Sequence, residues 1–343
     1  MFINTEILTN FVVDIFQAAG TPDAYARLVA ESLVRTNRTG HDSHGVVRVE
    51  TYLDGVAIGE IKPEAGPIVV QETGGVTIVD GQFGFGQVTA HFAMQETIEK
   101  AKQHGVAATG LQNCNHVGRL GEWVEMAAAE NMIGLAFCNV YNSPTRRVAP
   151  LGGTRPLFGT NPLAAAIPVA NQRPILLDFS TSIVSEGKVR LARNQNTEVP
   201  EGWLLDANGQ PTQNPHNLYD CGALLPMAGY KGFGLLVLTE LLGGVLMGTT
   251  GIGLPGQISR NGVLFIVLSV DAFGSMDAFL DQTATFYTDV KAEPSADGLD
   301  EILLPGDPET NAINQRGDNI PLDEPTWQLL RKAATELGVE IPG

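Results

Sequence analysis

The sequence predicts an α/β fold in which helices cover a mixed sheet, and two observations support this prediction. Short apolar runs of β-like composition alternate with helical segments between about residues 106 and 270, a pattern typical of a sheet buried on both faces. Of the 343 residues, 43% are hydrophobic and 17% are charged, which suits a sizeable core and not a disordered chain. At about 100–200 residues per domain, this length indicates two domains or one large interleaved one.

Two helices open the chain, and a long irregular stretch follows them. Apolar residues recur at helical spacing over 7–16, and Gly20 and Pro22 stand where this helix should end. A second helix is expected over about 23–36. The stretch 37–63 is rich in Gly and His and is too long for a simple connection, so we expect a functional loop there.

The middle of the chain is expected to form the sheet, beginning with a hairpin over 69–79. Beyond it the patterns predict, in order, a helix over 88–104, a strand over 106–111, a helix over 119–130, strands over 133–138, 163–168 and 175–179, a helix over 231–247 and a strand over 263–270. From Asp289 onward, acidic residues and prolines indicate a surface crossing. A final amphipathic helix over 326–337 is expected to pack on the N-terminal helices.

Charge and cysteine content exclude several partners and compartments. The chain has 21 Lys and Arg against 38 Asp and Glu, a net charge of −17, so we expect neither nucleic acid nor an anionic membrane surface as a partner. The apolar stretch 232–248 is shorter than the ~20 residues of a membrane span and contains Glu240. Three scattered cysteines fit no disulfide framework or zinc knuckle, and no signal-peptide pattern opens the chain. We therefore expect a cytoplasmic protein.

The literal G-x-G-x-x-G match does not have the setting of a Rossmann fingerprint. It occupies residues 251–256, after an apolar helix instead of a strand, and Pro255 removes an N–H group from the phosphate cradle. Residues 84–89 come close to the motif but also follow the wrong kind of element. Both segments are interpreted as flexible loops, so a nucleotide bound by this chain would be held by other means.

The densest cluster of reactive side chains lies at residues 40–48, GHDSHGVVR. An enzyme that reduces a 2-keto acid needs a group to protonate the developing alkoxide, and histidine suits this because its pKa lies near neutrality. It also needs a planar fork for the substrate carboxylate, which Arg48 can supply. The alternative is a surface turn with a capping aspartate and incidental histidines.

Hydrolase and metal-binding roles for the histidines are less well supported by the sequence. A hydrolase built on Ser43 and His44 is disfavoured, because adjacent side chains rarely face each other and no G-x-S-x-G elbow occurs. A metal site from His41, His44 and His116 lacks a dedicated spacing, so no metal is expected. His116 follows a predicted strand and precedes a helix, where ligands and anions gather, or else it simply caps that helix.

Two turns and two lysines offer further polar groups near strand and helix ends. The turns at 159–162 and 177–182 carry hydroxyl and amide groups that can contact ribose or phosphate, although they are equally ordinary turns. Lys188 and Lys231 each stand beside glycine, and a lysine at a helix start can reach a pyrophosphate. Taken singly, each is more often a solvated lysine.

Eight segments together resemble the family of malate/L-lactate dehydrogenase-like oxidoreductases that lack a Rossmann fold, and within it the hydroxycarboxylate dehydrogenases. They are GHDSHGVVR (40–48), FGQVTAHFAM (85–94), NHVGRLGEW (115–123), FGTNP (158–162), LLDFSTSIVSEGKVRLA (176–192), VPEGWLLDANGQPTQNP (199–215), YKGFGLLVLTELLGG (230–244) and LPGDPE (304–309). They occur in the family's order and reach over nearly the whole chain. The resemblance implies a non-Rossmann NAD(P)-binding domain over 116–289 and a second, substrate-side domain built from 1–115 and 290–343.

The resemblance also implies roles for individual residues. His44 matches the proton donor, Ser43 the hydroxyl that orients it, and Arg48 the carboxylate-binding position. His116 matches an acid/base residue in some members and a substrate or cofactor contact in others. Substrate contacts are expected at Thr160 and Lys188. Nicotinamide-nucleotide contacts are expected at His116, Val117, Gly118, Thr160, Asp178, Phe179, Ser180, Lys231, Gly232, Gly306 and Asp307.

The expected reaction interconverts 2-keto and 2-hydroxy acids with NAD, or NADP as the alternative, in a homodimer. Cyclic imino-acid reductases of the family carry Asp where this chain has Lys188, which disfavours that activity. A ureidoglycolate-type or diketogulonate-type dehydrogenase on the same scaffold stays open. A binding protein without catalysis is the alternative from another class.

Overall fold

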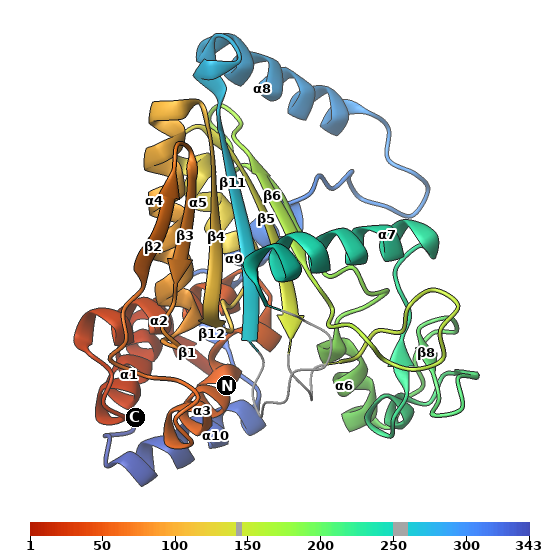
Figure 1. The fold of residues 1–343 in the computed structure, drawn as a ribbon. Helices are drawn as coiled ribbons and strands as arrows, with labels where there is room; N and C mark the ends of the chain where they lie inside the picture. The colour runs from red at the N-terminus through yellow and green to blue at the C-terminus, as the bar shows by residue number, and fades with distance from the viewer. Residues whose placement is uncertain (142–145, 250–259) are drawn as a thin grey trace.

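The structure, a computed structural model, describes residues 1–141, 146–249 and 260–343, and a seven-stranded mixed sheet lies at its centre (Figure 1). The order of its strands is β2-β3-β4-β11-β5-β6-β7. The strands are β2 (Ile68–Thr73), β3 (Val76–Asp80), β4 (Val106–Asn115), β5 (Met132–Tyr141), β6 (Leu163–Ile167), β7 (Ile175–Phe179) and β11 (Arg260–Ser269). In this sheet β3 and β4 run parallel and the other neighbours are antiparallel. The predicted α/β class and mixed sheet are confirmed.

Helices cover both faces of the sheet, as expected for strands that are apolar on both sides. On one face, α4 (Gly86–His104) and α5 (Gly121–Ala129) enclose a core that contains Met94, Trp123 and Phe265. On the other lies the helix that starts as α7 (Tyr230–Thr239), widens into the π-helical turn η4 (Glu240–Gly244) and ends in η5 (Val245–Met247). A Cβ on Gly110 of β4 would lie 2.0 Å from the Met247 sulfur, so this helix lies directly against the sheet.

This helix, 230–247, is also long and apolar enough to cross a membrane by length and composition alone, and 39% of it is buried inside the protein. Its Glu240 is buried and accepts a hydrogen bond of 2.6 Å from the Asn161 amide. A Cβ on Gly243 would lie 2.8 Å from backbone atoms of β5. Packing on the sheet accounts for part of the apolar character of this segment.

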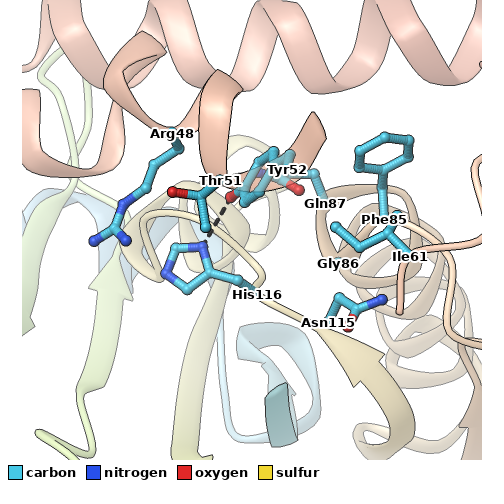
Figure 2. Close-up of a pocket in the computed structure, with 9 residues that line it drawn as sticks. All are labelled: Arg48, Thr51, Tyr52, Ile61, Phe85, Gly86, Gln87, Asn115 and His116. Atoms are coloured by element: carbon cyan, nitrogen blue, oxygen red, sulfur yellow. Dashed lines mark hydrogen bonds between the residues drawn. The ribbon is translucent and has the colours of Figure 1, made fainter. Parts of the chain in front are cut away.

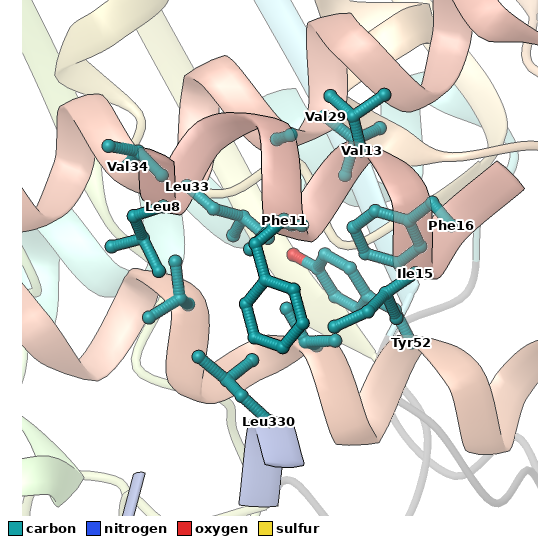
Figure 3. Close-up of a cluster of buried hydrophobic side chains, with 14 of the residues drawn as sticks. Leu8, Phe11, Val13, Ile15, Phe16, Val29, Leu33, Val34, Tyr52 and Leu330 are labelled. Atoms are coloured by element: carbon teal, nitrogen blue, oxygen red, sulfur yellow. The ribbon is translucent and has the colours of Figure 1, made fainter. Parts of the chain in front are cut away.

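The two ends of the chain meet in a separate hydrophobic cluster (Figure 3). It contains α1 (Thr5–Ala18), α2 (Asp23–Arg38), α3 (Val49–Ala57) and α10 (Glu324–Leu337), and β1 (Phe2–Asn4) pairs with β12 (Asn319–Pro321) beside them. The rings of Phe11 and Trp327 lie 5.7 Å apart, which confirms that the last helix packs on the N-terminal helices. The domain division at residues 115 and 290 stays a prediction. The sheet contains strands from both sides of residue 115.

Several elements differ from the sequence prediction. The stretch 37–63 contains α3, preceded by the 3-10 turns η1 (Asp42–His44) and η2 (Val46–Arg48), so it is not irregular throughout. The surface crossing after residue 289 contains α9 (Asp307–Arg316), whose buried residues are two carboxylates and no apolar side chain, so no apolar periodicity signalled it. The other elements missed were β1, α6 (Glu186–Gln195), β8 (Leu204–Leu205), β9 (Pro211–Thr212), η3 (Pro215–Tyr219), β10 (Ala223–Leu224), η6 (Val270–Ala272), α8 (Met276–Ala292) and β12. The G-x-G-x-x-G segment 251–256 lies outside the described residues.

Candidate active site

The loop at 40–48 is shaped by contacts from both ends of the chain. The Asn37 side chain, at the end of α2, accepts a hydrogen bond from the Val46 N–H (2.9 Å) and donates one to Asp42 (2.7 Å). Asp42 also forms a two-pronged ion pair with Arg316 of α9, at 2.7 and 2.9 Å. A Cβ on Gly45 would lie 2.2 Å from the Asn37 oxygen, so only glycine fits at this bend.

Within this loop, Ser43, His44 and Arg48 form one group. The Ser43 hydroxyl lies 3.0 Å from Nδ1 of His44, so these neighbouring side chains do face each other, contrary to the expectation from their adjacency. Both residues lie within the 3-10 turn η1. Nε of Arg48 donates to the Ser43 carbonyl at 2.8 Å. No ion pair to the rest of the Arg48 guanidinium occurs among the described residues, which leaves a fork suited to a carboxylate.

His116 lies directly after β4 and faces His44. The two imidazole rings are stacked, with centroids 5.4 Å apart and planes 25° from parallel. Nδ1 of His116 lies 2.8 Å from the Tyr52 hydroxyl, and Gln87 donates to the same hydroxyl at 2.8 Å. The structure therefore brings together the predicted proton donor, its orienting serine, the predicted carboxylate-binding arginine and the second histidine.

Burial and positive neighbours favour the neutral forms of both imidazoles. Burial, with Arg48 as the next cause, lowers the pKa of His116 to about 3. Burial also lowers the pKa of His44 well below its usual value, and Arg48, His116, His41 and Arg190 act in the same direction. Because an anionic ligand beside these groups would oppose that shift, carboxylate binding and protonation of His44 favour each other.

A pocket adjoins this group, with a space of roughly 390 Å³ including its open mouth. Tyr52, Ile61 and Phe85 form apolar walls, and Arg48 and His116 stand at its edge (Figure 2). A few polar groups beside an apolar wall are typical of small-molecule sites. The arrangement can hold a small organic acid by its carboxylate while an imidazole exchanges a proton with it.

The helix α6 brings a further predicted segment to the loop. A Cβ on Gly187 would lie 3.1 Å from the Cβ of Ser43, so the first turn of α6 packs against the candidate site. Lys188, one position on, is exposed and has no ion pair within the described ranges. Arg190, three positions after Gly187, lies on the same helical face, and its charge acts on both His44 and Arg48.

The predicted cofactor residues come from several elements around the sheet. The Val117 N–H donates to Asn261, the Gly118 N–H to His116, and the carbonyl of Thr160 accepts from Thr181. Asp178 in β7 accepts from the Gly121 N–H at the start of α5 (2.7 Å).

The other predicted cofactor residues have separate surroundings. Phe179 ends β7, and the Ser180 hydroxyl accepts from Ser182. Lys231 is exposed in the first turn of α7, next to the buried Gly232.

The turn at Gly306 and Asp307 lies at the opposite end of β7 from Phe179. A Cβ on Gly306 would lie 3.2 Å from Leu176. The Asp307 carboxylate is occupied by Lys291 (2.6 Å), the Tyr287 hydroxyl (3.0 Å) and the Leu304 N–H (2.8 Å). In this structure Asp307 anchors the end of α8, and its carboxylate has little capacity left for a cofactor.

Sequence reasoning missed Tyr52, Gln87 and Arg190. Tyr52 comes from a stretch expected to be irregular, and its helical spacing of four from Arg48 was the available signal. Gln87 lies in a segment that was noted only for its resemblance. Arg190 lies in α6, which was not predicted.

Comparison with known proteins finds similar sequences and structures over nearly the whole chain. A family model described as malate/L-lactate dehydrogenase matches residues 3–331. Hydroxycarboxylate dehydrogenase B of Escherichia coli O157:H7 is 38% identical over 344 residues, covering 98% of this chain and 94% of that protein. The structure of sulfolactate dehydrogenase from Methanocaldococcus jannaschii matches with a TM-score of 0.90 at 30% identity, covering 99% of this chain and 98% of that one. Delta1-piperideine-2-carboxylate reductase from Pseudomonas syringae pvar. tomato matches with a TM-score of 0.87 at 29% identity, covering 97% and 100%.

Replacing His116 by Asn should flatten the dependence of stability on pH. An unfolded histidine has a pKa of about 6.5, whereas folded His116 has a pKa of about 3. Below pH ~6.5 the unfolded chain therefore binds more protons, so the wild-type protein loses stability as the pH falls. Between pH ~6.5 and ~5 this residue should contribute about 2 kcal/mol to that loss. Urea unfolding at both pH values measures it.

The matched control for this experiment is His216→Asn, because His216 is exposed in η3. This variant should keep the pH dependence of the wild-type protein. Equal slopes for wild-type protein and His116→Asn would contradict the burial argument.

Proposed function

Because the chain belongs to the malate/L-lactate dehydrogenase family, we propose that it is an NAD(P)-dependent oxidoreductase that interconverts 2-keto and 2-hydroxy acids. The observation that carries the proposal is the group formed by His44, Ser43 and Arg48, packed against His116. It combines a proton-exchanging imidazole with a free guanidinium fork at the edge of one pocket, as the reduction of a keto acid requires.

The residues present fit a nicotinamide cofactor. Lys231 is exposed in the first turn of α7 and has no ion pair within the described ranges, and N–H groups at a helix start favour an anion. We assign four residues to binding the cofactor, namely Lys231, Gly232, Asp178 and Ser180. When bound, the reduced cofactor supplies the hydride that C2 of the keto acid accepts.

The protein's own residues then have distinct tasks. Arg48 binds the substrate carboxylate in its fork and fixes the position of C2. His44 donates a proton to the carbonyl oxygen as the hydroxyl forms, and takes it back in the reverse reaction. Since Ser43 occupies Nδ1 of His44, the exchange falls to Nε2. We also assign Thr160 and Lys188 to the substrate.

Activity on cyclic imino acids or on ureidoglycolate-type and diketogulonate-type substrates is the alternative. The likeness to delta1-piperideine-2-carboxylate reductase favours the first of these. Lys188 argues against it, because the imino-acid reductases that resemble this chain at Glu186 and Gly187 carry Asp at that position. Parallel kinetics on each substrate class, with NADH and with NADPH, separates the alternatives. We propose NAD as the preferred cofactor, and a higher kcat/KM with NADPH would overturn that choice.

His44→Ala should lower the rate of keto-acid reduction by about 10²–10⁴-fold, because it removes the general acid. NADH consumption with a panel of 2-keto acids measures the rate, and calorimetry should find NADH binding nearly unchanged. His104→Ala, at the exposed end of α4, is the control and should keep full activity. An unchanged rate in His44→Ala would exclude the role of His44. Binding of NADH by the wild-type protein without turnover of any substrate in the panel would instead indicate a binding protein.

Arg48→Lys tests the carboxylate fork separately. A lysine keeps the charge but loses the planar pair of donors, so KM for the keto acid should rise at least about tenfold, while NADH affinity stays the same. Arg27→Lys, exposed on α2, is the matched control. If KM and kcat both stayed at the wild-type values, Arg48 would have only a structural role.

We further propose that the protein is a cytoplasmic homodimer. Leu238, Leu241, Val245 and Leu246 are 43–61% exposed along one stretch of the helix that covers the sheet. The 17-residue helix α8 buries none of its residues within the chain, and a second copy of the chain would cover such surfaces. The cysteines Cys114, Cys138 and Cys221 are all free, in agreement with a reducing compartment.

Substituting Leu241 and Val245 together by Glu should convert the dimer into a monomer, because two charges would be buried at its interface. Light scattering coupled to size-exclusion chromatography measures the mass. Leu299→Glu, at a leucine that is also exposed but lies in the segment before α9, should leave the dimer intact. A monomeric wild-type protein would refute the proposal outright.

A further inference from the structure

We propose that Gln87 and Tyr52 hold His116 as a neutral imidazole with its proton on Nε2, which makes Gln87 a positioning residue for the reaction. The inference rests on the proposed function, because it assigns His116 a role beside His44 in that reaction. In this role His116 is a fixed hydrogen-bond donor, and His44 is the residue that gains and loses a proton.

The direction of the hydrogen bonds follows from a backbone group. The N–H of Gly118 points at Nδ1 of His116 at 3.3 Å, and a backbone N–H can only donate. Nδ1 must therefore accept, and in a neutral imidazole the proton then lies on Nε2. This conclusion does not depend on how any side-chain amide is oriented.

The Tyr52 hydroxyl connects His116 to Gln87 by two hydrogen bonds. Because Nδ1 of His116 accepts, the hydroxyl 2.8 Å away must donate its proton to it. Its oxygen is then left to accept, and the Gln87 amide nitrogen donates to it at 2.8 Å. Burial raises the pKa of Tyr52 to about 12, so the hydroxyl keeps its proton at physiological pH.

The burial of Gln87 indicates that its amide group has a role in hydrogen bonding and does not only fill space. Gln87 is fully buried, and its side-chain oxygen has no hydrogen-bond partner in the described part of the chain. A buried acceptor without a partner is destabilising, and an apolar side chain of similar size would avoid that defect. The hydrogen bond from its nitrogen to Tyr52 is the gain that offsets it.

The orientation of the His116 ring determines where its Nε2–H points. In Figure 2 the second ring nitrogen of His116 points toward the side where the Arg48 guanidinium lies. A substrate carboxylate held by Arg48 would bring the neighbouring carbonyl oxygen to that side. A neutral Nε2–H placed there can donate a hydrogen bond to this oxygen as negative charge develops on it. The two stacked histidines thus carry out different tasks.

The experiment measures the tautomer directly. In protein with ¹⁵N-labelled histidine, NMR distinguishes protonated from unprotonated ring nitrogens, and the signals lost in His116→Gln identify His116. At neutral pH the wild-type protein should have a neutral His116 with the proton on Nε2. The Gly118 N–H remains in Gln87→Leu and Tyr52→Phe, but at 3.3 Å it is a longer contact than the 2.8 Å one from Tyr52. Without the Tyr52 donor held in place, part of the His116 population should shift to the Nδ1 tautomer, and kcat for keto-acid reduction should fall at least about tenfold with a smaller change in KM.

Thr97→Val is the matched control, because Thr97 is another fully buried polar residue on α4 and bonds only within its helix. It should leave both the His116 signals and kcat unchanged. A proton on Nδ1 or a charged His116 in the wild-type protein would overturn the inference, and so would an unchanged spectrum in both Gln87→Leu and Tyr52→Phe. Because the spectrum is recorded without turnover, a confirmed tautomer with no keto-acid activity would refute the proposed function alone.

Discussion

The contact between Asp42 and Arg316 connects the loop of the candidate site to the far end of the chain. Arg316 lies in α9 and holds Asp42, which the Asn37 amide also contacts. Through this contact the last helices, which pack on the first ones around Phe11 and Trp327, determine how the backbone turns at Ser43 and His44. Residues from both ends of the chain therefore support the loop of the site, although its main residues lie within a single short segment.

The charge of the site is opposite to that of the protein as a whole. A chain with a net charge of −17 repels small organic acids at long range, and salt screens that repulsion over about 8–10 Å. Arg48 and Arg190 act on each other as like charges, and no acidic residue within the described ranges forms an ion pair with either. Besides burial, the charge of Arg190 lowers the pKa of Arg48, and the smaller opposing effect of Glu186 offsets the effect of Arg190 only in part. An anionic ligand would relieve that repulsion, which favours binding of acids over neutral molecules.

Repeats of apolar residues and short clusters of reactive side chains predicted those parts of the structure that nearby residues determine. The core helices and sheet strands were recognised because apolar residues repeat along them, and His44 and Arg48 because they share one loop. Gln87 and Tyr52 were not, since their importance arises from α4 and α3 meeting at His116, a tertiary contact that no spacing reveals. The contacts of Asp307 with Lys291 and Tyr287 are tertiary in the same way, while its assignment to the cofactor comes from the family resemblance and stays a prediction. Polar or partly exposed helices such as α6, α8 and α9 have no apolar stripe that would identify them.

Two imidazoles stacked 5.4 Å apart cannot both act as acids at the same time. With an effective dielectric constant of about 20, two unit charges at that separation repel by roughly 3 kcal/mol, and Arg48 adds to the penalty. The pair therefore holds at most one proton beyond the neutral state, and the surrounding hydrogen bonds decide which ring receives it. Nδ1 of His116 accepts from Gly118 and Tyr52, so protonating His116 would require breaking these two bonds. The Ser43 hydroxyl beside His44 can instead rotate and accept as readily as it donates, so we assign the mobile proton to His44.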